Sequence, residues 1–102
     1  MNAKTLKALR GSIRKWEHIK AGTEVDLGAS NCPLCRLFHK HFNETRICCH
    51  GCPVMKRTGL PQCRSTPYVN YINTCNPAEE KRYASKELVF LKSLLPKTKR
   101  HD

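Results

Sequence analysis

The chain has 102 residues, enough for one domain with a modest hydrophobic core. Hydrophobic residues make up 39% and charged residues 26%, a balance that excludes a disordered polar chain; no apolar run is long enough to span a membrane. The formal net charge of +11 favours nucleic acid, an anionic membrane surface or an acidic protein face as partner, unless the charge serves solubility alone.

The first predicted element is a basic amphipathic helix over residues 3–20. Its apolar side chains recur at steps of three and four, which favours burial in a core over a membrane or partner-helix surface. Gly11 weakens this helix by about 1 kcal/mol relative to alanine, so packing must help to hold it. The apolar stripe is Leu6, Leu9, Ile13 and Trp16, and the opposite side carries Lys4, Lys7, Arg14, Lys15 and His18. Residues 23–30 favour a turn-rich link or a short strand.

A cysteine-rich segment over residues 31–64 contains two Cys-x-x-Cys pairs. In a zinc knuckle, two residues between the thiolates allow a tight turn to aim both sulfurs at one ion. Pro33 and Gly51 suit such turns, and the loop that joins the pairs is long enough to bring them together. The pattern therefore predicts one bound Zn²⁺, with metal-free buried thiols or disulfides as the alternatives.

The predicted ligands are the four cysteines of the two pairs, and a fifth cysteine competes with them. They are Cys32, Cys35, Cys49 and Cys52, with Cys63 as the rival ligand. Cys48 is placed outside the shell because it lacks a partner at the knuckle spacing. His39 and His41 lie inside the loop as weaker candidates for coordination, phosphate contact or a surface position.

The same residues argue against an enzyme. Four thiolates close the coordination shell, whereas a catalytic zinc keeps one position open for water. Glu44 is the one carboxylate between the two pairs, and no His-x-Glu element of the deaminase type precedes a Cys-x-x-Cys. We therefore expect no catalytic residue and no small-molecule substrate.

Two further helices are predicted at residues 67–75 and 77–95, followed by a basic tail at 97–102. Thr66-Pro67 and Asn76-Pro77 each join a capping residue to a proline at the first helical position. Glu79 completes a spacing like that of a capping box. Tyr68 and Tyr71 favour packing in the core, with exposed stacking on bases as the alternative.

The predicted fold is therefore small and mainly α. Two amphipathic terminal helices pack around a zinc-stapled, loop-rich, zinc-knuckle-like centre, all within a single domain over residues 1–96. Because no secretory segment opens the chain, we expect a cytoplasmic protein with no membrane partner.

The order of the motifs resembles that of small cysteine-rich accessory proteins encoded by bacteriophages. The resemblance rests on Cys32-Pro33-Leu34-Cys35, Cys49-x-Gly51-Cys52-Pro53-Val54, Thr58-Gly59, Cys63 and Thr66-Pro67-Tyr68, preceded by a helix around Trp16. It implies a phage-encoded protein that acts in the host bacterial cytoplasm, and it places Cys63 within the motif. It implies no particular activity.

Two functions fit these features. The first is nucleic-acid binding by phosphate neutralisation, through Lys4, Lys7, Arg14, Lys15, Lys56, Arg57 and Arg64. The second is a protein-interaction module that binds and inhibits or redirects an acidic host protein. Steep salt dependence favours the first, and a stoichiometric host protein that survives nuclease treatment favours the second.

Overall fold

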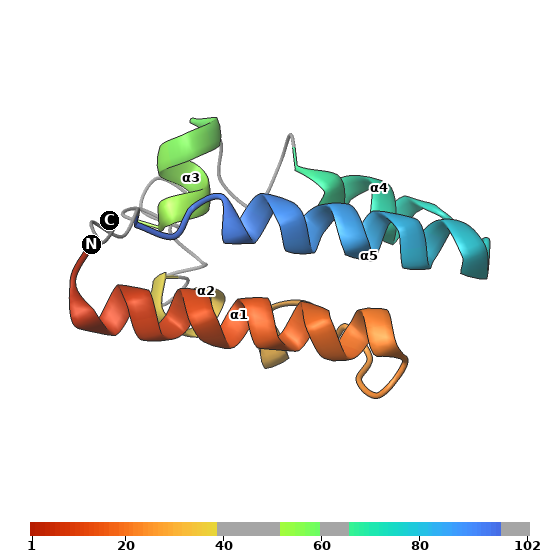
Figure 1. Ribbon diagram of the computed structural model, residues 1–102, viewed down its shortest axis with the longest axis horizontal. Coiled ribbons are helices and arrows are strands. Elements are labelled where there is room, and N and C mark those ends of the chain that lie inside the picture. Colours follow the sequence, from red (N-terminus) through yellow and green to blue (C-terminus); the bar gives the residue numbers. More distant parts are fainter. Residues whose placement is uncertain (39–51, 60–65, 97–102) are drawn as a thin grey trace, which may run out of the picture.

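Two long antiparallel helices, α1 (Ala3–Ala21) and α5 (Pro77–Lys92), lie side by side and form the frame of the fold (Figure 1). The computed structural model describes residues 1–38, 52–59 and 66–96. Within these ranges all regular secondary structure is helical, so the protein is mainly α, as predicted.

Helix α1 covers the residues predicted for it, and its two ends explain why. The side-chain oxygen of Asn2 accepts the backbone N–H of Thr5 at 2.8 Å, which caps the first turn. Gly22 follows the last turn with φ 83°, a left-handed conformation that glycine adopts without steric cost. Its N–H group and that of Thr23 bond to the carbonyls of the final turn.

Helix α5 begins at the predicted cap but ends earlier than predicted. Asn76 Oδ1 accepts the N–H groups of Ala78 and Glu79 at 2.9 and 3.2 Å. Glu79 has the spacing of a capping box, but its carboxylate accepts the Thr74 hydroxyl at 2.7 Å, and the Asn76 N–H bonds to that hydroxyl oxygen instead of to Glu79. The helix ends at Lys92 and a turn follows it, in which Leu94 is still buried.

The short helix α4 (Pro67–Asn73) packs against α5 and supplies two aromatic rings to α1. Trp16 meets the rings of Tyr68 and Tyr71 edge to face, with centroids 5.7 and 5.0 Å apart. Such pairs stabilise a core beyond the area that they bury. Both tyrosines thus pack against the core, the fate that the sequence favoured for them.

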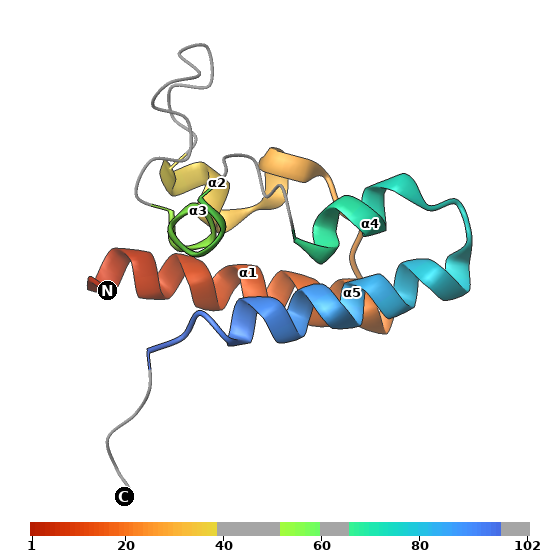
Figure 2. The ribbon, with the colours of Figure 1, turned by 90° about the horizontal axis from the view of Figure 1, so that it is seen from above.

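The core lies between α1 and α5 and is completed by two short helices, α2 (Pro33–Phe38) and α3 (Pro53–Thr58). Helix α2 lies beside the N-terminal half of α1, and α3 lies at the same end of the molecule, near the C-terminal end of α5 (Figures 1 and 2). The buried hydrophobic residues are Leu9, Ile13, Trp16, Ile19, Leu34, Cys52, Val54, Ala84, Leu88, Leu91 and Leu94. Leu6, predicted in the apolar stripe, is only half-buried.

The link after α1 holds a 3₁₀ helix, η1 (Gly28–Asn31), which agrees with the turn-rich alternative of the prediction; the described residues of the link form no strand. The prediction of a loop-rich centre is wrong within the described residues. The described parts of the cysteine-rich segment form α2 and α3 instead of loops. Each of these helices begins at a proline directly after a cysteine, where the fixed φ of proline favours the first helical turn. Residues 39–51, 60–65 and 97–102 lie outside the described ranges.

Across the described ranges, no helix combines the length and the apolar composition that a membrane crossing requires.

Candidate functional site

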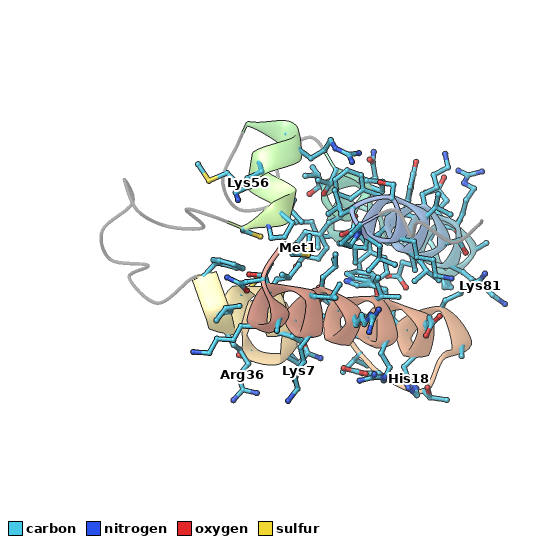
Figure 3. The ribbon with its side chains drawn as sticks, turned by 60° about the vertical axis from the view of Figure 1, so that its left-hand side comes forward. Met1, Lys7, His18, Arg36, Lys56 and Lys81 are labelled. Atoms are coloured by element: carbon cyan, nitrogen blue, oxygen red, sulfur yellow. The ribbon has the colours of Figure 1, made fainter. Side chains whose placement is uncertain are left out.

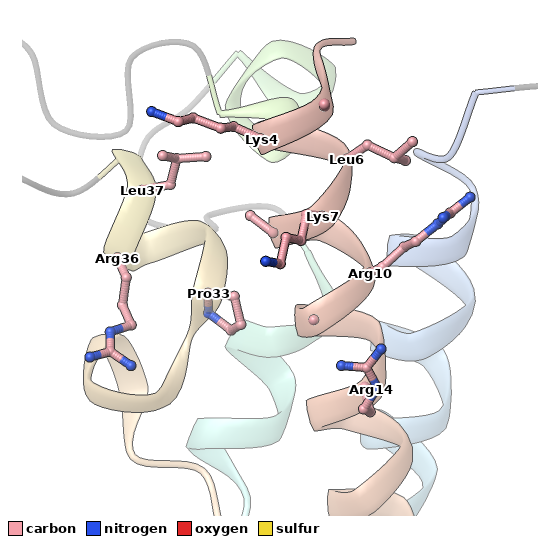
Figure 4. Close-up of a pocket in the computed structure, with 11 residues that line it drawn as sticks. Lys4, Leu6, Lys7, Arg10, Arg14, Pro33, Arg36 and Leu37 are labelled. Carbon is pink, nitrogen blue, oxygen red and sulfur yellow. The ribbon is translucent and has the colours of Figure 1, made fainter.

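An open groove of about 860 Å³ runs between the first half of α1 and α2 (Figure 4). Among the described residues, five cationic side chains and no carboxylate line it. The lining consists of Lys4, Lys7, Arg10, Arg14 and Arg36 with Ala3, Leu6, Ala8, Gly11, Pro33 and Leu37. We call this surface the basic groove. A concave surface with charge of one sign concentrates the field at its mouth, which suits an anionic ligand.

The spacing of α1 explains why four of these cations share one side. Leu9 and Ile13 face the core, so the residues about half a turn away from them, including Lys7 and Arg14, face outward. From Lys4 to Arg14 the helix rises about 15 Å at 1.5 Å per residue. The four cations that α1 contributes to the basic groove are all exposed, and none of them forms an ion pair with a described residue.

Helix α2 contributes the fifth cation, Arg36, through close packing on α1. A Cβ atom added at Gly11 would lie 3.0 Å from Cγ of Pro33, so the absence of a side chain at Gly11 permits this approach. Next to it, the buried Ser12 hydroxyl oxygen accepts the N–H of Leu34 at 3.3 Å. Lys7 and Arg36 consequently project from the same side of the molecule (Figure 3).

Lys15 does not belong to this surface, so the prediction that it lies on the exposed side of the helix is wrong. It is only 5% exposed, and its Nζ lies 2.8 Å from Oδ1 of Asp26. The Tyr68 hydroxyl donates to Oδ2 of the same carboxylate at 2.9 Å. Burial alone would raise the pKa of Asp26, but Lys15, with the Gly28 N–H and the Tyr68 hydroxyl, lowers it below its ordinary value.

The other predicted binding residues are divided between a second surface and the undescribed part of the chain. Lys56 and Arg57 are exposed on α3, and Lys56 projects on a different side from Lys7 (Figure 3). The Arg57 guanidinium donates to the carbonyl and the hydroxyl of Ser93, at 3.3 and 3.4 Å. Arg64 lies outside the described residues.

The basic groove therefore brings together three of the seven predicted residues, Lys4, Lys7 and Arg14, and adds two. Arg10 is three residues after Lys7 and four before Arg14, so helical spacing alone places it with them. Arg36 has no comparable signal, because only the packing of α2 on α1 brings it to the groove.

The first Cys-x-x-Cys pair shares one feature with zinc knuckles, a backbone N–H directed at a cysteine sulfur. Cys32 directly precedes α2, and its Sγ accepts the backbone N–H of Cys35 at 3.2 Å. The Cys35 side chain and N–H, with the charge of Lys15 and the Ser12 hydroxyl, lower the pKa of Cys32 to about 6 against the opposing effect of burial. The thiolate, which is the form that binds metal, is thus favoured near neutral pH.

The rest of the predicted metal shell is only partly described. Cys52 is buried at 7% exposure and directly precedes α3, at the same end of α1 as α2 (Figure 2). Cys48, Cys49, Cys63, His39, His41 and His50 lie outside the described residues. Among the residues that are described, no three potential metal ligands come together. The observed N–H to sulfur bond fits zinc, and the full ligand set remains a prediction.

A buried carboxyl group that the sequence analysis did not single out lies close enough to Cys32 to be affected by its charge. Glu87 on α5 is 2% exposed, and its Oε1 has no hydrogen-bond partner among the described residues. Burial, together with the negative charges of Cys32 and Asp26, raises the pKa of Glu87 to about 8, although the Tyr68 N–H and Lys15 act in the opposite direction. Helical spacing could have found it, because Glu87 is three residues after Ala84 and four before Leu91, two buried residues of the apolar face.

No protein-family model, no curated protein and no solved structure matches this chain.

Proposed function

We propose that this protein is a small, zinc-binding, non-enzymatic protein that binds nucleic acid through phosphate contacts in the basic groove. The observation that carries the proposal is the set of five cations around one groove without a carboxylate among them. Lysine and arginine side chains that neutralise phosphates release condensed counterions, and this release supplies most of the affinity in binding that does not depend on base sequence.

The proposed zinc ion acts as a structural support for the groove. Arg36 follows Cys35 directly in the chain, so a metal held by Cys32 and Cys35 also holds the helix that carries Arg36. The proposed shell is completed by Cys49 and Cys52, with Cys63 as the rival for one place. A closed shell of thiolates assigns the zinc a role in folding and leaves binding to the surface.

The test is the salt dependence of binding to a fluorescein-labelled 20-base-pair DNA, measured by fluorescence anisotropy between 25 and 200 mM salt. If all five cations contact phosphates, log K falls against log salt with a slope of about −4.5. The variant Lys7→Glu/Arg14→Glu is expected to bind at least about 100-fold more weakly at low salt, because two contacts are replaced by repulsion. An affinity that does not change with salt would contradict the proposal.

A matched control changes the net charge by the same amount on another helix. Lys81 and Lys86 are exposed on α5 and do not line the basic groove, and Lys81 projects far from Lys7 (Figure 3). Lys81→Glu/Lys86→Glu is therefore expected to bind within about threefold of the parent, since it retains the groove contacts. Equal losses in both variants would show that net charge, and not the groove, determines binding.

Purification from the natural cell tests the alternative partner. Native mass spectrometry reports the number of bound zinc ions and any retained macromolecule in one measurement. One stoichiometric host protein that survives nuclease treatment and moderate salt would replace nucleic acid with an acidic protein face as the partner. The origin in a bacteriophage and the action in the host cytoplasm are supported by the motif order, and both stay predictions.

A further inference from the structure

The basic groove is lined by cationic and aliphatic side chains and contains no aromatic ring among its described residues. Proteins that bind single-stranded nucleic acid usually combine cations with aromatic rings on which bases stack. Stacking contributes about 1–3 kcal/mol per base in such proteins. A groove without rings lacks this contribution and retains only its contacts with phosphate.

The described aromatic residues are used elsewhere in the fold. Tyr68 and Tyr71 lie against Trp16 in edge-to-face contacts, and Phe38 and Phe90 pack on the core. The remaining ring, Tyr83 on α5, lies beneath two of the cations of its own helix, with centroid distances of 5.5 and 5.7 Å. None of these rings borders the groove.

The cations of the groove also stand on rigid elements. Lys4, Lys7, Arg10 and Arg14 extend along about 15 Å of one helix. A duplex presents one negative charge per about 1.7 Å of its axis, twice the density along one of its strands, and it does so on a stiff backbone. Cations on a rigid helix therefore suit the stiff, dense phosphates of a duplex. A flexible single strand would lose conformational entropy when it binds to the same cations.

The helices packed against α1 restrict its access to the edges of the bases. The major groove of DNA is about 12 Å wide and admits a single helix with one face exposed. Helix α1 packs against α5 on its buried side, and α2 forms the other side of the basic groove. Two helices of about 10–12 Å diameter side by side are wider than the major groove, so this surface is shaped for the phosphate backbone and not for insertion toward the bases.

From these observations we infer that the basic groove binds double-stranded nucleic acid across its phosphate backbone, without dependence on base sequence and in preference to single strands. The inference rests on the proposed function, because it names the form of nucleic acid that the same groove takes.

The experiment compares three labelled 20-mers with the intact, zinc-loaded protein: a mixed-sequence DNA duplex, a G·C-rich duplex and single-stranded oligothymidine. For five phosphate contacts, the greater counterion release from a duplex corresponds to about tenfold tighter binding at 0.1 M salt. We expect that preference, slopes of log K against log salt near −4.5 for the duplexes and near −3.5 for the single strand, and affinities for the two duplexes within about threefold.

The outcomes separate this inference from the proposed function. If the single strand binds as tightly as the duplexes, the preference for duplexes is wrong while phosphate binding stands. If the two duplexes differ more than tenfold, the inference of sequence independence is wrong. If none of the three probes binds at 25 mM salt, the proposed function is itself overturned.

Discussion

The cations on the outer side of α1 and three other cations of α1 and α5 have opposite surroundings. Lys7, Arg10 and Arg14 meet no carboxylate in the basic groove. By contrast, Lys15 is buried against Asp26 at 2.8 Å. Two exposed pairs, Lys92 with Glu17 at 3.7 Å and Arg82 with Glu79 at 3.9 Å, neutralise further cations. The positive charge of the described surface is therefore unevenly distributed.

The comparison shows that the placement of the acidic residues decides where a basic protein is basic. The first 16 residues contain no Asp or Glu, and the first acidic residue is Glu17. Lys15 follows Arg14 directly, but a step of about 100° around the helix turns it toward the link that carries Asp26. One residue therefore separates a cation available to a ligand from one that only stabilises the fold.

Metal removal has the largest expected effect, because it acts on the helix that completes the groove. Extraction of zinc with a chelator should lower the free energy of unfolding by about 5 kcal/mol or more, since the energy of binding a structural zinc is largely folding energy. Thermal melting monitored by circular dichroism measures this, and restoring zinc should restore the melting temperature. An unchanged melting curve after verified metal removal would contradict the zinc site.

Breaking the buried pair should be more costly than breaking an exposed one. Asp26→Ala leaves the charge of Lys15 buried without its partner, and about 3 kcal/mol of stability should be lost. Glu17→Ala removes the half-exposed partner of Lys92 and should cost less than about 1 kcal/mol. Urea unfolding of both variants at pH 7 measures the loss in the free energy of unfolding. Equal losses would show that burial of the Lys15–Asp26 pair does not increase the cost of breaking it.

Glu87→Gln should stabilise the protein increasingly as the pH rises. The folded-state pKa of Glu87 is about 8, above its ordinary value of 4.5, so between these values the unfolded chain releases a proton that the folded protein keeps. Stability of the parent therefore falls through this window, by roughly 1 kcal/mol per pH unit from this group, and the amide variant avoids the loss. Urea unfolding of both proteins from pH 5 to pH 8 measures the difference, and a constant difference would contradict the shifted pKa.

The smallest effect is expected at the contact between α1 and α2. Gly11→Ala gains about 1 kcal/mol of helix propensity but places a Cβ 3.0 Å from Pro33, so stability should change by less than about 1 kcal/mol. The displaced α2 should carry Arg36 away from the groove and weaken duplex binding by about threefold. Gly11→Ala/Pro33→Ala removes the closer contact, with Cγ at 3.0 Å, and leaves that with Cβ at 3.2 Å, so it should recover most of the affinity of Pro33→Ala alone. Unchanged binding in Gly11→Ala would show that this contact does not shape the groove.

The sequence predicted best those elements whose stabilising interactions lie within one segment of the chain. The three longer helices were predictable because caps such as Asn76 and the three- and four-residue spacing of Leu9 and Ile13 act within one segment. The helices α2 and α3 were missed, because a segment of six residues carries too little periodicity to be distinguished from a turn. Glu79 has the spacing of a capping box but makes no bond back to the Asn76 N–H, because the nearby Thr74 hydroxyl bonds to its carboxylate.

The sequence by itself determined the mainly helical fold, the local turn of the first Cys-x-x-Cys pair and the cationic strip of α1, because each depends on neighbours within a few residues. Tertiary structure alone decided that Lys15 is buried and that Arg36 joins the groove. These outcomes depend on contacts between segments far apart in the chain, such as Lys15 with Asp26 and Gly11 with Pro33. Helical spacing indicates the face of the helix on which a residue lies, but not which residue from a distant segment contacts it.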